Sequence, residues 1–101
     1  MLALSDRVIA PAHVLIRHLD GESVLLNLET EKYFGLDATG TRMWELVTTS
    51  SNIQSAYAVL SVEFDADPTL LRNNLVELLN QLVDHGLLQV VPSDVESVPA
   101  I

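Results

Sequence analysis

Cysteine is absent from this chain of 101 residues. The sequence therefore offers no disulfide, no thiolate nucleophile and no cysteine-based zinc site. Long apolar runs are also missing, since none approaches the roughly 20 residues that a membrane-spanning helix needs. The first twelve residues are interrupted by Asp6 and Arg7, which argues against a secretory signal. We therefore expect a protein of the reducing cytoplasm that does not bind a membrane.

Basic residues are scarce as well. Five Lys and Arg stand against 14 Asp and Glu, which gives a formal net charge of -9 at pH 7. Phosphate backbones and anionic lipid headgroups repel such a surface, so binding to nucleic acid or to an anionic membrane is not expected. Hydrophobic residues make up 49% of the sequence, which is enough for one domain with its own packed core.

Groupings of catalytic or metal-binding residues are missing too. The histidines, His13, His18 and His85, are scattered, and the first two face opposite sides of a predicted strand. Most acidic residues stand at predicted turns and helix starts, where carboxylates accept from free backbone N–H groups. The glycines form no phosphate-binding loop. The sequence thus predicts no enzymatic activity, no bound metal and no cofactor.

The first half of the chain predicts an antiparallel β-meander. Residues 12–19 and 22–28 are rich in branched apolar residues, and Asp20–Gly21 between them is a strong hairpin signal. Residues 29–32 form a polar turn, and residues 33–36 ("YFGL") give a third, short strand. Because sequential strands pair as neighbours, this third strand is expected at an edge of the sheet.

Three helices are expected after the strands. Asp37 or Thr39 can cap the first helix, and Ser51 with Gln54 fits a capping box for the second. The apolar stripe of the first helix comprises Met43, Trp44, Leu46 and Val47, and that of the second comprises Ile53, Ala56, Tyr57 and Leu60. We expect Trp44 to pack in the core rather than to touch a ligand.

The third helix has the clearest limits. Asp67 before Pro68 is the order expected for an N-cap and a first helical position, and Gly86 suits a C-terminal cap after a helix that runs to about His85. Its apolar sector spans about 160°, against the roughly 100° that one core contact requires. The central line is Leu71, Leu75, Leu78 and Leu82, flanked by Val76, Leu79 and Val83. This width favours contact with two elements, the core and either the sheet edge or a docked ligand.

These elements predict an α+β fold, winged helix-turn-helix-like, with a three-stranded antiparallel β-sheet followed by three α-helices. Residues 1–11 are interpreted as a lead-in, with a short strand near Arg7–Ala10. Residues 12–91 form the predicted domain, in which residues 87–91 either add a strand or simply pack. Residues 92–101 contain two prolines and are expected to be a loose tail.

Two kinds of function are open to this order of elements. A winged-helix DNA-binding protein would use residues 68–85 as its recognition helix, yet Arg72 is its one arginine beside Glu77 and Asp84. A peptide-binding module would use residues 33–36, which carry no proline and leave the sheet edge poorly protected. Tyr33, Phe34 and Leu36 are equally compatible with the core, and both roles can hold because successive strand residues face opposite sides.

The residues from Leu26 to Val47, "LNLETEKYFGLDATGTRMWELV", are followed by "LLNQLVDHGLL" at positions 78–88. This ordered set resembles the PqqD-like family over roughly residues 12–90. Its members are RiPP recognition elements, which bind the leader peptides of ribosomally made, post-translationally modified peptides. The resemblance implies that a precursor's leader pairs with the third strand and lies against the third helix.

The resemblance also implies a set of site residues and partners. The implied peptide-binding residues are Tyr33, Phe34, Gly35, Leu36 and Asp37 in the strand, and Leu71, Asn74, Leu75 and Leu78 in the helix. Free-standing members of this length commonly serve lasso peptide pathways, which implies a leader peptidase and an ATP-dependent macrocyclase as further partners. Other members serve radical SAM enzymes, as in pyrroloquinoline quinone synthesis, and that alternative stays open.

Overall fold

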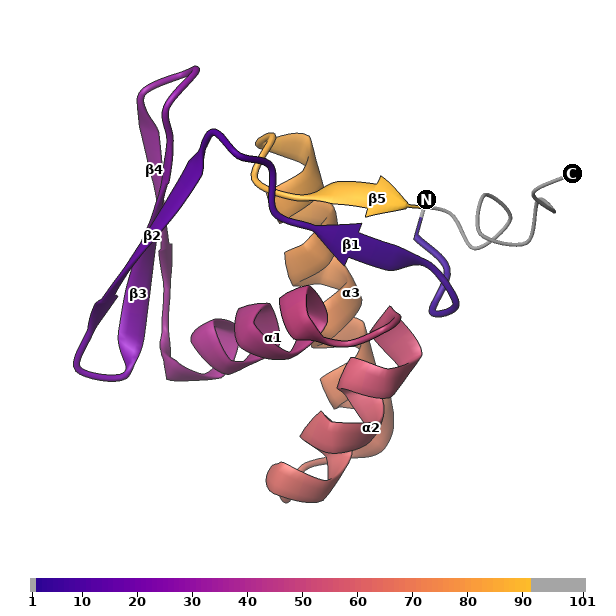
Figure 1. The fold of residues 1–101 in the computed structure, drawn as a ribbon. Coiled ribbons are helices and arrows are strands. Elements are labelled where there is room, and N and C mark those ends of the chain that lie inside the picture. Colours follow the sequence, from indigo (N-terminus) through magenta and orange to yellow (C-terminus); the bar gives the residue numbers. More distant parts are fainter. Residues whose placement is uncertain (1, 92–101) are drawn as a thin grey trace, which may run out of the picture.

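A three-stranded sheet, three helices and a small two-stranded sheet make up the structure, a computed structural model that describes residues 2–91 (Figure 1). The predicted tail, residues 92–101, lies outside this range. The elements follow in the order β1 (Arg7–Ile9), β2 (Val14–Leu19), β3 (Glu22–Asn27), β4 (Lys32–Leu36), α1 (Ala38–Thr49), α2 (Ile53–Glu63), α3 (Pro68–Asp84) and β5 (Gln89–Val91). The predicted order of a three-stranded meander followed by three helices is confirmed.

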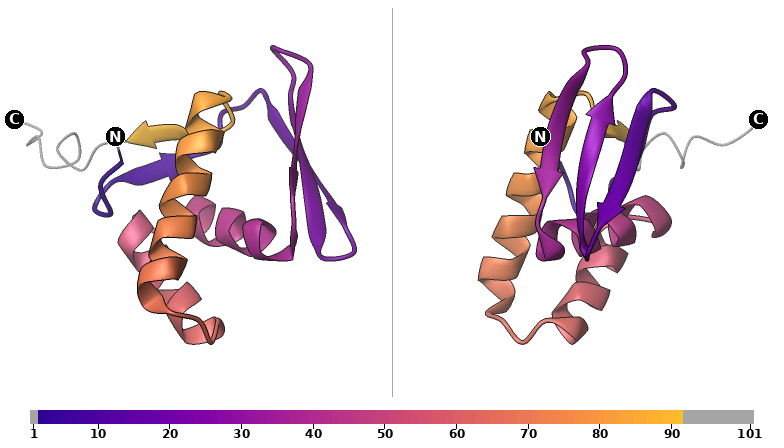
Figure 2. Two further views of the ribbon diagram at one scale, coloured as in Figure 1. Left: turned by 180° about the vertical axis from the view of Figure 1, so that it is seen from behind. Right: turned by 90° about the vertical axis from the view of Figure 1, so that its left-hand side faces the viewer.

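The meander has the strand order β2-β3-β4, with both pairs antiparallel. Asp20 and Gly21 have φ angles of 51° and 85°, as the two central positions of a tight hairpin turn require. The helices lie on one side of this sheet, so its other face is uncovered by elements within residues 2–91 (Figure 2).

The sequence predicts the N-cap residue correctly for two of the three helices. Asp37 caps α1 by accepting from the amide of Gly40 (2.8 Å), and Asp67 caps α3. The capping box predicted from Ser51 is wrong, because α2 begins at Ile53 and its N-cap is Asn52, which accepts from the amide of Ser55 at 2.8 Å. Serine and asparagine are about equally good N-cap residues, so the residue that caps the helix is the one that directly precedes its first helical residue.

The core lies between the helices and the inner face of the sheet. The predicted stripe of α1 is buried, and Trp44 packs there with Leu25 of β3. On α3 the buried line is Leu71, Leu75, Leu79 and Leu82, so Leu79 takes the place that the sequence pattern gave to Leu78. The helix is therefore rotated slightly relative to the predicted orientation. Leu78 is half-buried and lies toward β4.

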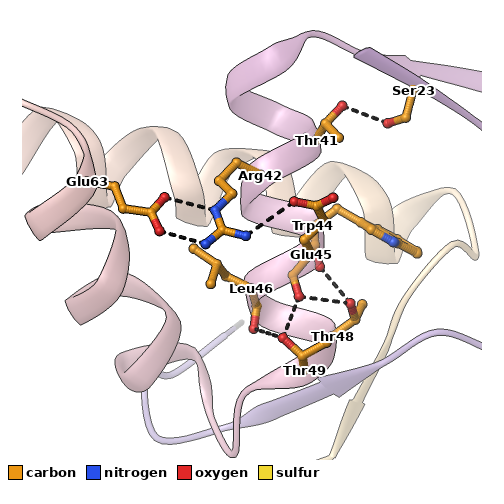
Figure 3. A network of polar contacts seen from close by, with 9 residues as sticks. All are labelled: Ser23, Thr41, Arg42, Trp44, Glu45, Leu46, Thr48, Thr49 and Glu63. Carbon is orange, nitrogen blue, oxygen red and sulfur yellow. Dashed lines mark hydrogen bonds and ion pairs between the residues drawn. The ribbon is translucent and has the colours of Figure 1, made fainter. Parts of the chain in front are cut away.

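Polar contacts hold α1 between the sheet and α2 (Figure 3). Arg42 donates to both carboxylate oxygens of Glu63, through Nε (2.8 Å) and Nη2 (2.6 Å). This side-chain hydrogen bond lowers the pKa of Glu63. On the sheet side, the buried hydroxyls of Ser23 and Thr41 lie 2.8 Å apart. The helix that follows β4 is therefore fixed at both of its flanks.

The small sheet joins the two ends of the described chain. β1 pairs antiparallel with β5, so the short strand expected near Arg7–Ala10 is confirmed, and residues 87–91 both pack and add a strand. Val8, Leu87 and Leu88 are buried in the core. The N-terminal segment also accepts hydrogen bonds from the first turn of α2, where the amide of Gln54 donates to the carbonyl of Leu4 (2.8 Å).

Candidate functional site

The open edge of β4 forms the first wall of the site. β4 pairs with β3 on one side, and within residues 2–91 no strand lies on its other side. The amide of Leu28 donates to the carbonyl of His13 (2.9 Å), so even-numbered residues at this end of the ladder bond to β2. Odd-numbered residues of β3 therefore face β4, where Leu25 is opposite Phe34.

This alternation decides which residues of β4 are available to a ligand. Because the backbone of Phe34 bonds to β3, its neighbours Tyr33 and Gly35 direct their N–H and C=O groups away from β3, toward the open edge of the sheet. An exposed row of such groups is a template for pairing with another chain. The side chains alternate as well, since Phe34 and Leu36 face the helices while Tyr33 and Gly35 face the opposite surface.

The second wall is α3, which runs beside β4 (Figure 2, right). A hollow of about 350 Å³ separates the two elements. Its lining from the strand and α1 is Phe34, Gly35, Leu36, Asp37, Thr39, Gly40 and Met43, and its lining from α3 is Asn74, Leu78 and Gln81. The three α3 residues are spaced i, i+4 and i+7, so they form one line on the helix surface.

A polar clamp ties the C-terminal end of β3 and the β3–β4 turn to the end of α3. The amide nitrogen Nδ2 of Asn27 donates to the carbonyl of His85 (3.1 Å), and its Oδ1 accepts from the amides of Glu29 (2.9 Å) and Thr30 (3.3 Å). The rings of Phe34 and His85 meet edge to face, with centroids 5.3 Å apart. Asn27 is buried, so this clamp sets the spacing between the β3–β4 turn and α3.

Close packing fixes the lower end of the site, where β4 passes into α1. A Cβ atom on Gly40 would lie 3.3 Å from Oδ1 of Asp37 and 3.3 Å from Cδ2 of Leu36. Glycine at this position therefore lets the helix begin directly against the strand. Both ends of the β4–α3 hollow are therefore held by contacts within the domain.

The structure brings most of the predicted site residues together. Phe34, Gly35, Leu36, Asp37, Asn74 and Leu78 line the hollow. Tyr33 is 72% exposed on the far surface of the sheet, and it reaches the site through its backbone. Leu71 and Leu75 are buried in the core and do not line the hollow.

Other residues of the site were missed by sequence reasoning. Gln81 follows Leu78 by one helical turn, and that spacing was a usable signal. The apolar stripe of α1 predicts only core packing for Met43, which in the structure also lines the hollow. Asn27 and His85 are 58 positions apart, and no local pattern links them.

The chemistry of the site is that of backbone pairing beside an apolar wall. Within residues 2–91, no group of three or more His, Cys, Asp and Glu side chains is placed to hold a metal ion. Over the same range, every helix is too short or too polar to cross a bilayer. An open strand edge beside a partly apolar helix defines the class of domains that accept an extended segment as an added strand.

The comparison with protein families identifies the family of this chain. A family model described as coenzyme PQQ synthesis protein D (PqqD) matches residues 22–88. The chain therefore belongs to the PqqD family, and the resemblance noted from its sequence is confirmed. No curated protein matches the chain.

Two solved structures resemble this chain. TbiB1, in complex with the TbiA(beta) leader peptide, is 32% identical with a TM-score of 0.74, and the match covers 80% of this chain and 94% of that chain. A lasso peptide synthetase B1 complexed with the leader peptide is 17% identical with a TM-score of 0.70, and the match covers 87% of this chain and 99% of that chain. The second likeness concerns the fold alone, whereas the first also supports the family.

Proposed function

We propose that this protein binds the leader region of a ribosomally made precursor peptide as an added strand on β4, against α3. The observation that carries the proposal is the open backbone of Tyr33 and Gly35 beside the hollow that contains Leu78. The solved relative at 32% identity, itself in complex with a leader peptide, supports the same ligand class.

The proposed contacts divide between backbone and side chains. Tyr33 and Gly35 supply N–H and C=O groups, which bond to any extended segment whatever its sequence. Phe34 and Leu78 offer apolar surface to alternate side chains of the peptide, the buried Leu36 borders the same hollow, and Asn74 and Gln81 add polar groups. Leu71 and Leu75 act from the core, where they hold α3 in place.

The protein itself catalyses nothing in this proposal. It serves lasso peptide biosynthesis in the cytoplasm by delivering the bound precursor to a leader peptidase and to an ATP-dependent macrocyclase. The support is the solved relative at 32% identity in complex with a leader peptide, and the lasso pathway is the one that the sequence resemblance implies. A second candidate, a peptide chaperone for a radical SAM enzyme, is favoured by the description of the matching family as a coenzyme PQQ synthesis protein.

Titration of the isotopically labelled protein with the leader encoded by the neighbouring precursor gene tests the proposal. We expect amide shifts in residues 33–37 and along residues 70–83, and no comparable response to duplex DNA. Absence of shifts in both segments would contradict strand addition. Copurification with either a leader peptidase or a radical SAM enzyme then separates the two pathways.

A further inference from the structure

Helix α2 turns an apolar side toward solvent. Its 11 residues include a single charged side chain, that of Glu63, and Arg42 engages this carboxylate through two hydrogen bonds. The outer side of the helix carries Ala58, Val59 and Val62, of which Val59 is 39% and Val62 is 86% exposed. A helix that is apolar all round is normally buried, yet within residues 2–91 no element covers this side of α2 (Figure 1).

The serines of α2 do not interrupt this apolar side. Ser61 donates its hydroxyl to the carbonyl of Ala58 (2.9 Å), and the hydroxyls of Ser51 and Ser55 lie 3.5 Å apart. These hydroxyls therefore meet part of their hydrogen-bonding need locally. Residues three and four positions apart share one side of a helix. On this spacing, the α2 face consists of Ser55, Ala58, Val59 and Val62.

The two valines of the α2 face are poorly explained by the domain alone. β-branched residues are weaker helix formers than alanine, because their side chains lose rotamer freedom against the preceding turn. Val62 is almost fully exposed, so little burial within residues 2–91 offsets this cost. Exposed apolar patches on small domains mark sites of association. Burial against a second molecule would supply the stabilisation that the described part of the chain does not.

The charges at one end of the α2 face select the kind of partner. Asp65 and Asp67 follow the helix and are exposed, and the C-terminal end of a helix is itself negative. Because α2 carries no Lys or Arg, a second copy of this helix would offer no basic group to these carboxylates, and the net charge of -9 opposes self-association. An apolar surface with Lys or Arg at one end is complementary to the whole face.

The α2 face is separated from the proposed leader site by α1. Thr41 of α1 contacts Ser23 of β3, and Arg42 of α1 contacts Glu63 of α2 (Figure 3). A protein docked on α2 is therefore not required to touch a leader paired with β4. Of the two enzymes in the proposed function, the peptidase cuts the precursor while its leader is bound, and the macrocyclase acts afterwards. A face remote from the leader fits the enzyme that acts second.

We infer that the α2 face is a docking surface for a second protein with an apolar contact region and Lys or Arg at one end of it. Given the proposed function, on which this assignment rests, the partner is the ATP-dependent macrocyclase. Docking on α2 would keep this enzyme close to the place where the peptidase releases the rest of the precursor. The α2 face and the β4–α3 hollow are separate surfaces, so they can be occupied at the same time and tested separately.

The test measures two affinities for one set of full-length variants. The probes are the purified macrocyclase encoded in the same gene cluster and the fluorescently labelled leader peptide. Val62→Glu and, independently, Ala58→Glu place a charge on the α2 face. Asn73→Glu is the matched control, because it adds the same charge at an exposed position of α3. Both α2 variants are expected to weaken macrocyclase binding by about tenfold or more with leader affinity unchanged, whereas Asn73→Glu changes neither.

Two milder variants separate docking from folding. Val62→Ala introduces the better helix former, so its melting temperature is expected to equal or exceed that of the wild type, while macrocyclase binding weakens by about threefold or more. Asp65→Asn is expected to weaken macrocyclase binding in low salt, and the difference from the wild type should disappear in high salt.

Wild-type strength of macrocyclase binding in both glutamate variants, or no macrocyclase binding by the wild-type protein, overturns the inference. Binding of the peptidase that Val62→Glu abolishes overturns the choice of partner. Sedimentation that shows a wild-type dimer, dissociated by Val62→Glu, overturns the inference in favour of self-association. Failure of the wild-type protein to bind leader refutes the proposed function instead, and macrocyclase binding measured without leader still decides the docking surface.

Discussion

Proline at position 35 offers the sharpest test of strand addition. The N–H of Gly35 points away from β3, so its removal leaves the β3–β4 ladder intact, and proline is tolerated on an edge strand when its missing N–H faces solvent. The leader peptide, in contrast, loses the donor for one of its carbonyl groups. Gly35→Ala is the matched control, since it keeps the N–H and its Cβ meets no atom within 4 Å.

The expected loss of affinity for the leader follows from the number of backbone hydrogen bonds that the β4 edge can make. Tyr33 and Gly35 together present two N–H and two C=O groups, and Gly35→Pro removes one of the four. A hydrogen bond contributes about 0.5–1.5 kcal/mol net, and an acceptor left unsatisfied in a covered groove costs about 1–3 kcal/mol. We therefore expect binding weaker by about 1–3 kcal/mol, or roughly 5- to 150-fold in Kd.

Fluorescence anisotropy with labelled leader measures the two affinities, and thermal unfolding checks the fold. Equal leader binding by Gly35→Pro and Gly35→Ala, with both proteins folded, would refute pairing at this edge. Phe34→Pro supplies the opposite control. Because the N–H of Phe34 faces β3, this change is expected to damage the sheet itself and to lower the melting temperature.

Three further predictions concern the wall, the clamp and the α1–α2 bridge. Leu78→Ala is expected to raise the Kd for leader by about fivefold or more, because Leu78 lines the hollow, whereas Val76→Ala on the other flank leaves the anisotropy titration unchanged. Asn27→Asp keeps both turn acceptors but loses the donor to α3, so urea unfolding should show a loss of about 1–3 kcal/mol; unchanged stability would exclude the clamp. Because the pKa of Glu63 is lowered in the folded protein, its bond to Arg42 stabilises the fold fully at pH values above the ordinary carboxyl pKa. This stabilisation is lost as the pH falls through the pKa of Glu63 in the folded protein. The urea midpoint of Glu63→Gln is therefore expected to depend less on pH in the acidic range than that of the wild type.

Local rules predicted those parts of the fold that depend on neighbouring residues. Asp20–Gly21 specified its turn because few residue pairs accept positive φ at both positions. Asp67–Pro68 specified the start of α3 for a similarly local reason. The third strand was placed at a sheet edge because hairpins in sequence leave the last strand with one neighbour.

Features that depend on distant residues escaped the sequence. The pairing of β1 with β5 joins the two ends of the described chain, and no periodicity in either short strand indicates its partner. The bond from Asn27 to the carbonyl of His85 is equally nonlocal. The sequence pattern predicts the apolar sector of α3. Whether Leu78 or Leu79 faces the core, however, depends on where β4 lies, and the position of β4 is a property of the assembled fold.

The pleat of β4 also determines where the side chains of an added strand point. A strand added at Tyr33 and Gly35 continues the alternation of the sheet, so every second side chain of the leader enters the hollow beside α3 and the others extend the outer face. On the outer face, β4 offers the exposed ring of Tyr33 and the bare backbone of Gly35 to these outward-facing leader residues. Selection among leader sequences is therefore expected to come mainly from the side chains that enter the hollow beside α3.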